Sequence, residues 1–448
     1  MTSSPPEYIV SRPVKGDDFY DRQEIINAFL NSNDSSIAVI GVRRIGKTSI
    51  LRQINYMIEN DPEKANKYVV VNLDLQNLVG DVTEILDGFR EMFLEEQTIK
   101  DWFKGISRPS PENINPERFL KQIAAKAKTK NKTLILLCDE IEQVTELGEA
   151  GKYIGRTLRI AAEKYTNVRV VAAASPLICT SKEPLLSDLI DLLERHPIGR
   201  FNNKEAEKLC QLKNRRKESP IPKEIYEKII ELSGGHPYFI QKLCLEYYLS
   251  KELAKAIKAV NKASMVSNQF VKDISNLDEV NQDILRIIVP SKNSTNRIAR
   301  KIGLPPDNMD ERLTFLSNLG LIIERYGRWE ISTIFFRKWL IKRGEKKDRV
   351  KKWEGVTFGF VVFLTLIISS AAYLILTSFN YCPLLDCIIF SPRFVIEWFI
   401  VVLAGFLIAL GYEFIILFPK HWKLLTIIFT SVLTGVALIC AILALFLK

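Results

Sequence analysis

Short apolar runs alternate with amphipathic segments over residues 1–354. Four of these runs are short enough for buried strands. They cover residues 37–40, 68–75, 133–138 and 168–174. Helical patterns fill the gaps, including residues 22–30 before the first run and 47–58 after it. Strands that alternate with helices predict a parallel sheet covered on both faces, so the expected fold class is an α/β (αβα) sandwich.

A helical pattern continues from residue 203 to about residue 274, with a break at Ser233-Gly234-Gly235. Three short helices and two strand-like runs that turn at Gly327 follow. The helices are expected at 281–289, 295–302 and 307–319, and the strands at 321–325 and 328–332. Three helices and a hairpin are the pattern of a winged helix.

Charged residues nearly disappear from residue 355 onward. Three apolar runs, at 356–377, 394–418 and 424–447, are each long enough to cross a bilayer as a helix. Only the second run contains charged residues, Glu397 and Glu413, and both lie near its ends. The sequence therefore predicts an all-α transmembrane region of three helices, with the lipid bilayer as a partner.

The formal net charge of +10 does not by itself indicate nucleic acid, because much of it lies just before the first apolar run. The basic residues there are Arg337, Lys338, Lys342, Arg343, Lys346, Lys347, Arg349, Lys351 and Lys352. Such clusters mark the cytoplasmic side of a membrane. Since the first ten residues lack the features of a signal peptide, we expect a multi-pass protein of the inner membrane with a cytoplasmic N-terminus and an external C-terminus.

The seven cysteines show no metal-ligand spacing. Those at 138, 179, 210 and 244 are expected to be reduced and mostly buried. Cys382 and Cys387 fall on the expected outer side of the membrane, where a disulfide is feasible but is not required by the pattern. The three histidines lie too far apart in sequence to indicate a metal cluster.

A phosphate-binding motif follows the first predicted strand. The sequence G-x-x-x-x-G-K-[ST] is matched by Gly41, Val42, Arg43, Arg44, Ile45, Gly46, Lys47 and Thr48, and Ser49 follows. In this position the backbone N–H groups and the helix dipole face an anion. Lys47 is expected to reach the β- and γ-phosphates, and the Thr48 hydroxyl to bind Mg²⁺. The roles of Arg43 and Arg44 stay open between phosphate, a neighbouring subunit and solvent.

The third predicted strand ends in two carboxylates, Asp139 and Glu140. The carboxyl ends of parallel strands line the ligand crevice, so both are expected to face the phosphates. Asp139 is the candidate for Mg²⁺, and Glu140 for orienting or deprotonating the attacking water. Ser175, after the fourth strand, either contacts the γ-phosphate or water, or belongs to an ordinary turn. The candidate catalytic residues are thus Lys47, Glu140 and Ser175.

Four segments together resemble the STAND-type ATPases of the AAA+ superfamily and the related archaeal ATPase family. They are residues 19–24, 41–49, 139–140 and 233–237. The resemblance extends over about residues 15–345 and implies ATP or ADP with Mg²⁺ as ligands. It also implies that Phe19 and Tyr20 lie near the adenine, and that His236 and Pro237 lie in the lid against the nucleotide. For His236-Pro237 a helix break with proline at its first position remains the alternative.

The resemblance and the patterns together predict five segments. These are a nucleotide-binding αβα core at 1–202, a helical lid at 203–275, a winged-helix-like domain at 276–345, a basic linker at 346–354 and three transmembrane helices at 355–448. Proteins of this kind are mainly switches, closed with ADP and self-associating with ATP, and are frequent in prokaryotic defence. The expected function is therefore a membrane-anchored ATP-dependent switch that forms homo-oligomers in the ATP state. The membrane helices serve as anchor or effector, and the trigger is unidentified.

Two other functions compete with the switch. A membrane-tethered, origin-recognition-like DNA-binding ATPase would share the core and the winged helix. Its recognition helix, however, would begin with Asp307, Asp310 and Glu311, which favours a protein contact over a phosphate backbone. An ATPase subunit of a membrane transport assembly is the third hypothesis, and residues 231–235 match the signature of transporter ATPases only weakly.

Overall fold

The computed structural model describes residues 8–32, 35–104, 115–179 and 184–343 of the 448-residue chain. Residues Met1–Lys342 belong to one compact unit, and all contacts described below lie within it. The predicted linker and the three predicted membrane spans lie outside the described residues, as do Cys382 and Cys387. Across the described ranges, no helix has both the length and the apolar character of a membrane span.

A five-stranded parallel sheet in the order β2-β3-β4-β1-β5 forms the centre of the N-terminal part. The strands are β1 Ile37–Ile40, β2 Tyr68–Asp74, β3 Thr133–Asp139, β4 Val168–Ala174 and β5 Glu194–Pro197. All four residues of β1 and all seven of β4 are buried, because helices cover both faces. The predicted parallel α/β sheet is therefore confirmed.

The fifth strand was missing from the sequence prediction. Its residues are Glu194, Arg195, His196 and Pro197, and none of them is buried. It pairs in parallel with β1 at the edge of the sheet. An edge strand that is partly exposed needs no apolar run, so the pattern used to find the other strands could not detect it.

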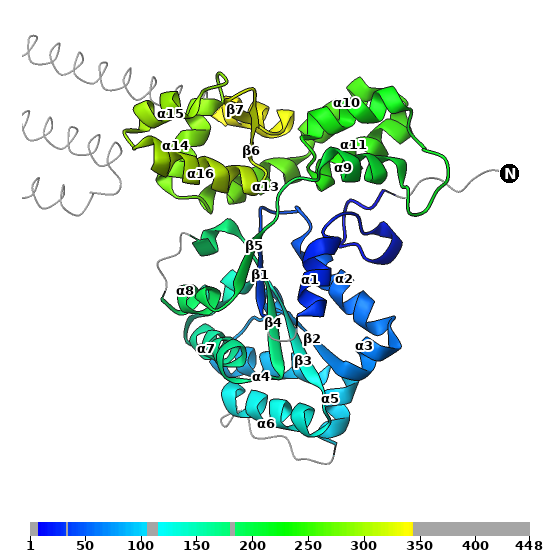
Figure 1. Ribbon diagram of the computed structural model, residues 1–448, viewed down its shortest axis with the longest axis vertical. Coiled ribbons are helices and arrows are strands. Elements are labelled where there is room, and N and C mark those ends of the chain that lie inside the picture. The colour runs from blue at the N-terminus through cyan, green and yellow to red at the C-terminus, as the bar shows by residue number, and fades with distance from the viewer. Residues whose placement is uncertain (1–7, 33–34, 105–114, 180–183, 344–448) are drawn as a thin grey trace, which may run out of the picture. The chain divides into compact units, whose positions relative to one another are not determined.

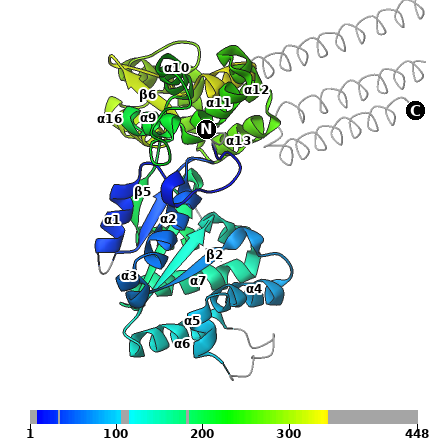
Figure 2. The same cartoon turned by 90° about the vertical axis from the view of Figure 1, so that its right-hand side faces the viewer.

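Helices flank this sheet on both sides. They are α1 Gln23–Asn31, α2 Lys47–Glu59, α3 Pro62–Lys67, α4 Val82–Leu94, α5 Gln97–Trp102, α6 Pro116–Thr129, α7 Gly148–Lys164 and α8 Pro184–Asp191. In Figure 1, α1 and α2 lie to one side of β1, and α7 and α8 to the other. Figure 2 shows α3 and α4 on either side of β2, and both contact that strand. Short 3₁₀ turns η1 Gly16–Asp18, η2 Leu75–Asn77, η4 Ile141–Thr145 and η5 Pro176–Cys179 complete this part.

Helices dominate the rest of the described chain. They are α9 Asn203–Gln211, α10 Lys223–Ser233, α11 Pro237–Ser250, α12 Leu253–Lys262, α13 Ser264–Ser275, α14 Glu279–Ile288, α15 Thr295–Ile302 and α16 Pro306–Asn318. The antiparallel hairpin of β6 Ile322–Arg325 and β7 Arg328–Ile331 follows, and residues 334–343 are again helical. Three helices and a hairpin thus occur where the sequence predicted them. Their assignment to the winged-helix class stays a prediction.

Candidate functional site

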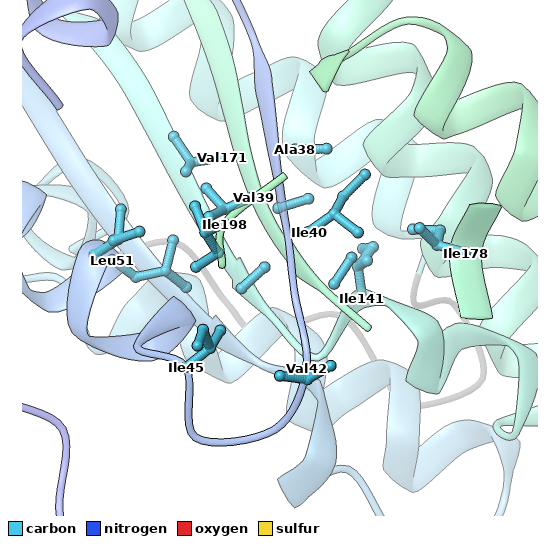
Figure 3. Close-up of a cluster of buried hydrophobic side chains, with 14 of the residues drawn as sticks. Ala38, Val39, Ile40, Val42, Ile45, Leu51, Ile141, Val171, Ile178 and Ile198 are labelled. Carbon is cyan, nitrogen blue, oxygen red and sulfur yellow. The ribbon is translucent and has the colours of Figure 1, made fainter. Parts of the chain in front are cut away.

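The loop between β1 and α2 is anchored by its apolar side chains. Val42 is 2% exposed and Ile45 is 1% exposed, and Figure 3 shows both among the buried side chains around β1. Burial of two side chains of this size contributes roughly 1.5–3 kcal/mol each. The loop is therefore held in part by its apolar side chains.

Gly46 begins α2 with a backbone φ of +111°, a value that a residue with a side chain rarely adopts. Its neighbour Arg44 also has a positive φ, +62°. Two such residues so close together bend the backbone sharply before the first turn of the helix. This bend is the local reason for a glycine at position 46, and it places the N-terminus of α2 at the end of the loop.

Lys47 lies at the centre of the site and is half-buried in the wall of a cavity. Its Nζ donates to the carbonyl oxygens of Gly41 at 2.9 Å and Val42 at 3.1 Å. Burial lowers the pKa of Lys47, and nearby carboxylates raise it. In decreasing order of effect, the carboxylates are those of Glu142, Asp273, Asp139 and Glu140. The ammonium group thus lies near several carboxylates and donates to two carbonyls of its own loop.

Thr48 and Asp139 lie side by side at the start of α2 and the end of β3. Burial raises the pKa of Asp139, and a hydrogen bond from Thr48 and the charge of Lys47 act in the opposite direction. A hydroxyl and a carboxylate are oxygen ligands that suit Mg²⁺, which keeps several water ligands in phosphate sites. In the described part of the chain, no group of three or more His, Cys, Asp or Glu side chains could hold a metal. Thr48 and Asp139, together with water and the phosphates, would hold Mg²⁺.

Glu140 follows β3 in the left-handed region, with φ +49°. Burial raises the pKa of its carboxyl, which Arg43 lowers and Glu142 raises further. Its Oε2 atom is buried and has no hydrogen-bond partner among the described residues. A buried carboxylate oxygen without a partner is costly, by roughly 1–3 kcal/mol or more. The position is therefore suited to hold a water molecule or another ligand.

Glu142 is a site residue that the sequence prediction missed. Its Oε1 accepts a hydrogen bond from the backbone N–H of Ser175 at 3.1 Å. The second oxygen of Glu142 and the hydroxyl of Ser175 are buried and lack partners in the described ranges. Glu142 thereby connects the ends of β3 and β4. The signal in the sequence was a third acid two residues after the Asp139-Glu140 pair.

A cavity of about 640 Å³ lies over the loop. Of the residues predicted for the site, those that line it are Phe19, Tyr20, Arg43, Arg44, Ile45, Gly46, Lys47, Thr48, Ser49, Asp139, Glu140 and Pro237. Gly41, Ser175 and His236 are not in its wall. Residues 9–14 and three residues of α13, Asn268, Gln269 and Lys272, also line it, and the sequence prediction included none of these.

The N-terminal segment that lines the cavity is held by α2. Ser49 accepts a hydrogen bond from the Val14 N–H at 3.2 Å, and Gln53 accepts one from the Gly16 N–H at 2.7 Å. Phe19 and Tyr20 follow this segment and are 8% and 6% exposed. A half-apolar cavity of this volume is of the size that binds small ligands. The aromatic end of the cavity is thus fixed to the same helix that begins at the phosphate loop.

His236 precedes α11 and is buried against Phe239, with the ring centroids 4.9 Å apart. Burial lowers the pKa of His236 to about 3, so the imidazole is neutral, although the backbone of Arg43 favours the charged form. Neither ring nitrogen makes a well-formed hydrogen bond to a described residue. Pro237 occupies the first position of α11, as the helix-break alternative predicted, and it also lines the cavity.

Arg43 and Arg44 contact the helices that follow the sheet. The guanidinium of Arg44 lies over the Tyr238 ring, 4.6 Å from its centroid. The Arg43 backbone N–H donates to Asp273 Oδ1 at 2.9 Å, and Gln269 Nε2 donates to the Arg43 carbonyl at 3.0 Å. The phosphate loop is therefore in contact with both α11 and α13. The contacts of Arg43 are made by its backbone, so the roles of the two arginine side chains towards phosphate or a neighbouring subunit stay predictions.

The loop between the buried strand β1 and α2 contains two glycines and a half-buried lysine, and a carboxylate pair lies beside it. These features define a P-loop nucleoside triphosphatase. Within that class, the family of ATPase domains predominantly from Archaea matches residues 19–243, just over half of the chain. The chain belongs to this family of ATPases. None of the curated proteins matches its sequence.

Solved structures agree with the fold. The Walker-type ATPase PABY2304 of Pyrococcus abyssi is 16% identical, with a TM-score of 0.53, over 74% of this chain and 99% of that one. The ORC2 protein of Aeropyrum pernix, in its ADPNP and ADP complexes, is 12% identical with a TM-score of 0.44, over 73% and 93% of the two chains. At these identities the first likeness shows the fold alone, and the second is too distant to carry an argument.

Proposed function

We propose that this ATPase is a membrane-anchored switch of the STAND type within the AAA+ superfamily. The observation that carries the proposal is the contact of the phosphate loop with α11 and α13. The backbone of Arg43 is bound by α13, and the side chain of Arg44 stacks on α11. A change of the nucleotide in the loop therefore affects both helices. The nucleotide state is thereby coupled to the predicted lid, which is a requirement for a switch.

Within this proposal, Lys47 exchanges the carbonyls of Gly41 and Val42 for the β- and γ-phosphates when a nucleotide enters. Thr48 and Asp139 would hold Mg²⁺, which would supply positive charge to the phosphates. Glu140 orients the attacking water, since its buried oxygen has no other partner among the described residues. These roles are those that the P-loop mechanism assigns to such residue types.

The remaining predicted residues take supporting roles. Phe19 and Tyr20 contact the base at the aromatic end of the cavity, with Ser49 fixing the segment before them. Ser175 supports the phosphate end indirectly, because its N–H binds Glu142 and its side chain is not in the cavity wall. His236 supports the lid as a neutral, buried ring rather than as a direct ligand, and Pro237 faces the nucleotide.

The proposal places the ATPase at the cytoplasmic face of the inner membrane. Its support is the sequence pattern of residues 337–447, in which a basic cluster precedes three long apolar runs. The membrane helices act as anchor or as effector. The ATP state self-associates, and an unidentified protein or ligand triggers the exchange.

ATP turnover by purified full-length protein tests the enzymatic part. We expect Lys47→Ala and Glu140→Gln to lower turnover by at least about 10²-fold, because each removes a group that stabilises the transition state or prepares the water. Exposed residues offer matched controls, Lys258→Ala on α12 and Glu224→Gln on α10, which should keep wild-type turnover. Equal turnover in all five proteins would show that hydrolysis occurs elsewhere or by a contaminant.

A further inference from the structure

The backbone N–H and the backbone carbonyl of Arg43 are both bound by one helix, α13, that lies more than 220 residues later in the sequence. Asp273 accepts from its N–H at 2.9 Å, and Gln269 donates to its carbonyl at 3.0 Å. Both side chains are buried, at 2% and 5% exposure. Asp273 and Gln269 are one helical turn apart on α13, so they form a clamp on the third residue of the phosphate loop.

The clamp brings a negative charge to the phosphate end of the site. Burial raises the pKa of Asp273 to about 6, against the effects of the Arg43 N–H and the Lys47 charge. The carboxyl is therefore mostly ionised at pH 7. Asp273 also acts on Lys47, where it is second among the carboxylates that favour the ammonium form. Asp273 and the γ-phosphate of ATP would consequently compete for the same lysine.

We infer that Asp273 and Gln269 determine how strongly this site distinguishes a nucleoside diphosphate from a triphosphate. The inference rests on the proposed function, since it assigns a regulatory role to residues outside the hydrolytic set. With ADP, no γ-phosphate competes with Asp273 for the charge of Lys47, and the clamp stays closed. ATP brings a γ-phosphate whose charge repels the buried carboxylate, so the triphosphate binds only as the bonds to Arg43 weaken.

The same helix carries the change to the end of the described chain. Phe270, between the two clamp residues, packs on Phe336 and Trp339, with ring centroids 4.9 Å and 5.7 Å apart. These two rings belong to the helical residues 334–343, which precede the predicted basic linker. When the clamp opens, α13 shifts against this aromatic cluster. The clamp therefore links the γ-phosphate to the segment that leads towards the predicted membrane helices.

The test compares dissociation constants for ADP and ATP, measured by competition with a fluorescent ADP analogue. Full-length protein in detergent is used with Mg²⁺ in the Glu140→Gln background, so that ATP is not consumed. Asp273→Asn keeps an oxygen for the Arg43 N–H but removes the charge. We expect it to tighten ATP about tenfold relative to ADP, a typical coupling between two states, while ADP binding changes less than about twofold.

Two further variants make the result specific. Gln269→Ala removes the other half of the clamp but leaves the charge of Asp273. It should therefore shift the ratio of the ATP and ADP dissociation constants in the same direction by a smaller factor. Asp310→Asn changes an exposed carboxylate on α16 and should leave the ratio unchanged. If Asp273→Asn still bound ADP and its ratio of ATP to ADP dissociation constants were unchanged, the role inferred for the clamp would be overturned. The proposed ATPase activity would be unaffected by that result. Absence of binding of either nucleotide to the parent Glu140→Gln protein would remove both.

Discussion

Glu142 shows how a single side chain outside the predicted set affects the proposed reaction. It binds the N–H of Ser175 and faces Lys47 and Glu140 with its charge. The residue is a positioning group, because it acts on the candidate base and lysine rather than on the nucleotide. Its effect on Glu140 gives a measurable consequence.

Replacing Glu142 with glutamine should shift the pH dependence of ATP turnover. The carboxylate of Glu142 raises the pKa of Glu140, so Glu142→Gln lowers that pKa. A general base works in its deprotonated form, and the acidic limb of the pH–rate profile therefore moves to lower pH. The weaker base should also reduce the plateau rate by roughly three- to tenfold, a small part of what a general base contributes.

The control for this experiment is Glu146→Gln, which changes an exposed carboxylate just after η4. It should leave both the limb and the plateau unchanged. If the acidic limb of Glu142→Gln coincided with that of the wild type, Glu142 would have only a structural role in joining β3 to β4.

The elements were predictable to the extent that each has a local pattern. Strands β1 and β4 have the expected bounds, and β2 and β3 differ by one residue at the C-terminal end. The polar edge strand β5 was not predicted, since pairing with β1 rather than burial defines it.

The phosphate loop and the carboxylate pair were evident because their residues are adjacent in sequence. The contact of Arg43 with Asp273 was not, because no local pattern connects residues so far apart.

The break between α10 and α11 has a steric origin. Gly234 ends α10 with φ +58°, and a Cβ atom there would lie 2.0 Å from the carbonyl oxygen of Ser332. The backbone of the break thus packs directly on the segment after β7. A side chain at this position would separate two parts of the described chain.

We expect Gly234→Ala to destabilise the protein by more than about 3 kcal/mol, because a backbone clash adds to the roughly 1 kcal/mol strain of positive φ. Gly303→Ala is the matched control, since Gly303 also ends a helix with positive φ but a Cβ there meets nothing within 4 Å. Thermal unfolding of the two variants measures the difference. Equal losses of Tm would show that strain, and not the contact with Ser332, requires the glycine.

For the whole molecule, the proposed membrane attachment depends on residues 355–448, and its support is their sequence pattern. We expect the full chain to stay in the membrane fraction after carbonate extraction and to be released by detergent, because three apolar runs partition into the bilayer. A tag placed after Lys448 should be accessible to protease only from the outer side. Full release by carbonate would contradict the membrane anchor. A tag that resists protease added from the outer side would contradict the predicted external C-terminus.

The central claim, that nucleotide state controls assembly, is tested most directly by the molar mass of full-length Glu140→Gln protein in detergent. Light scattering with saturating ADP should give a smaller particle, and with saturating ATP a larger one, because only the triphosphate opens the contacts between the phosphate loop and α13. Lys47→Ala should keep the smaller mass in both cases. A mass that is the same with ADP and ATP, in protein shown to bind both, would contradict the switch and leave a simple ATPase.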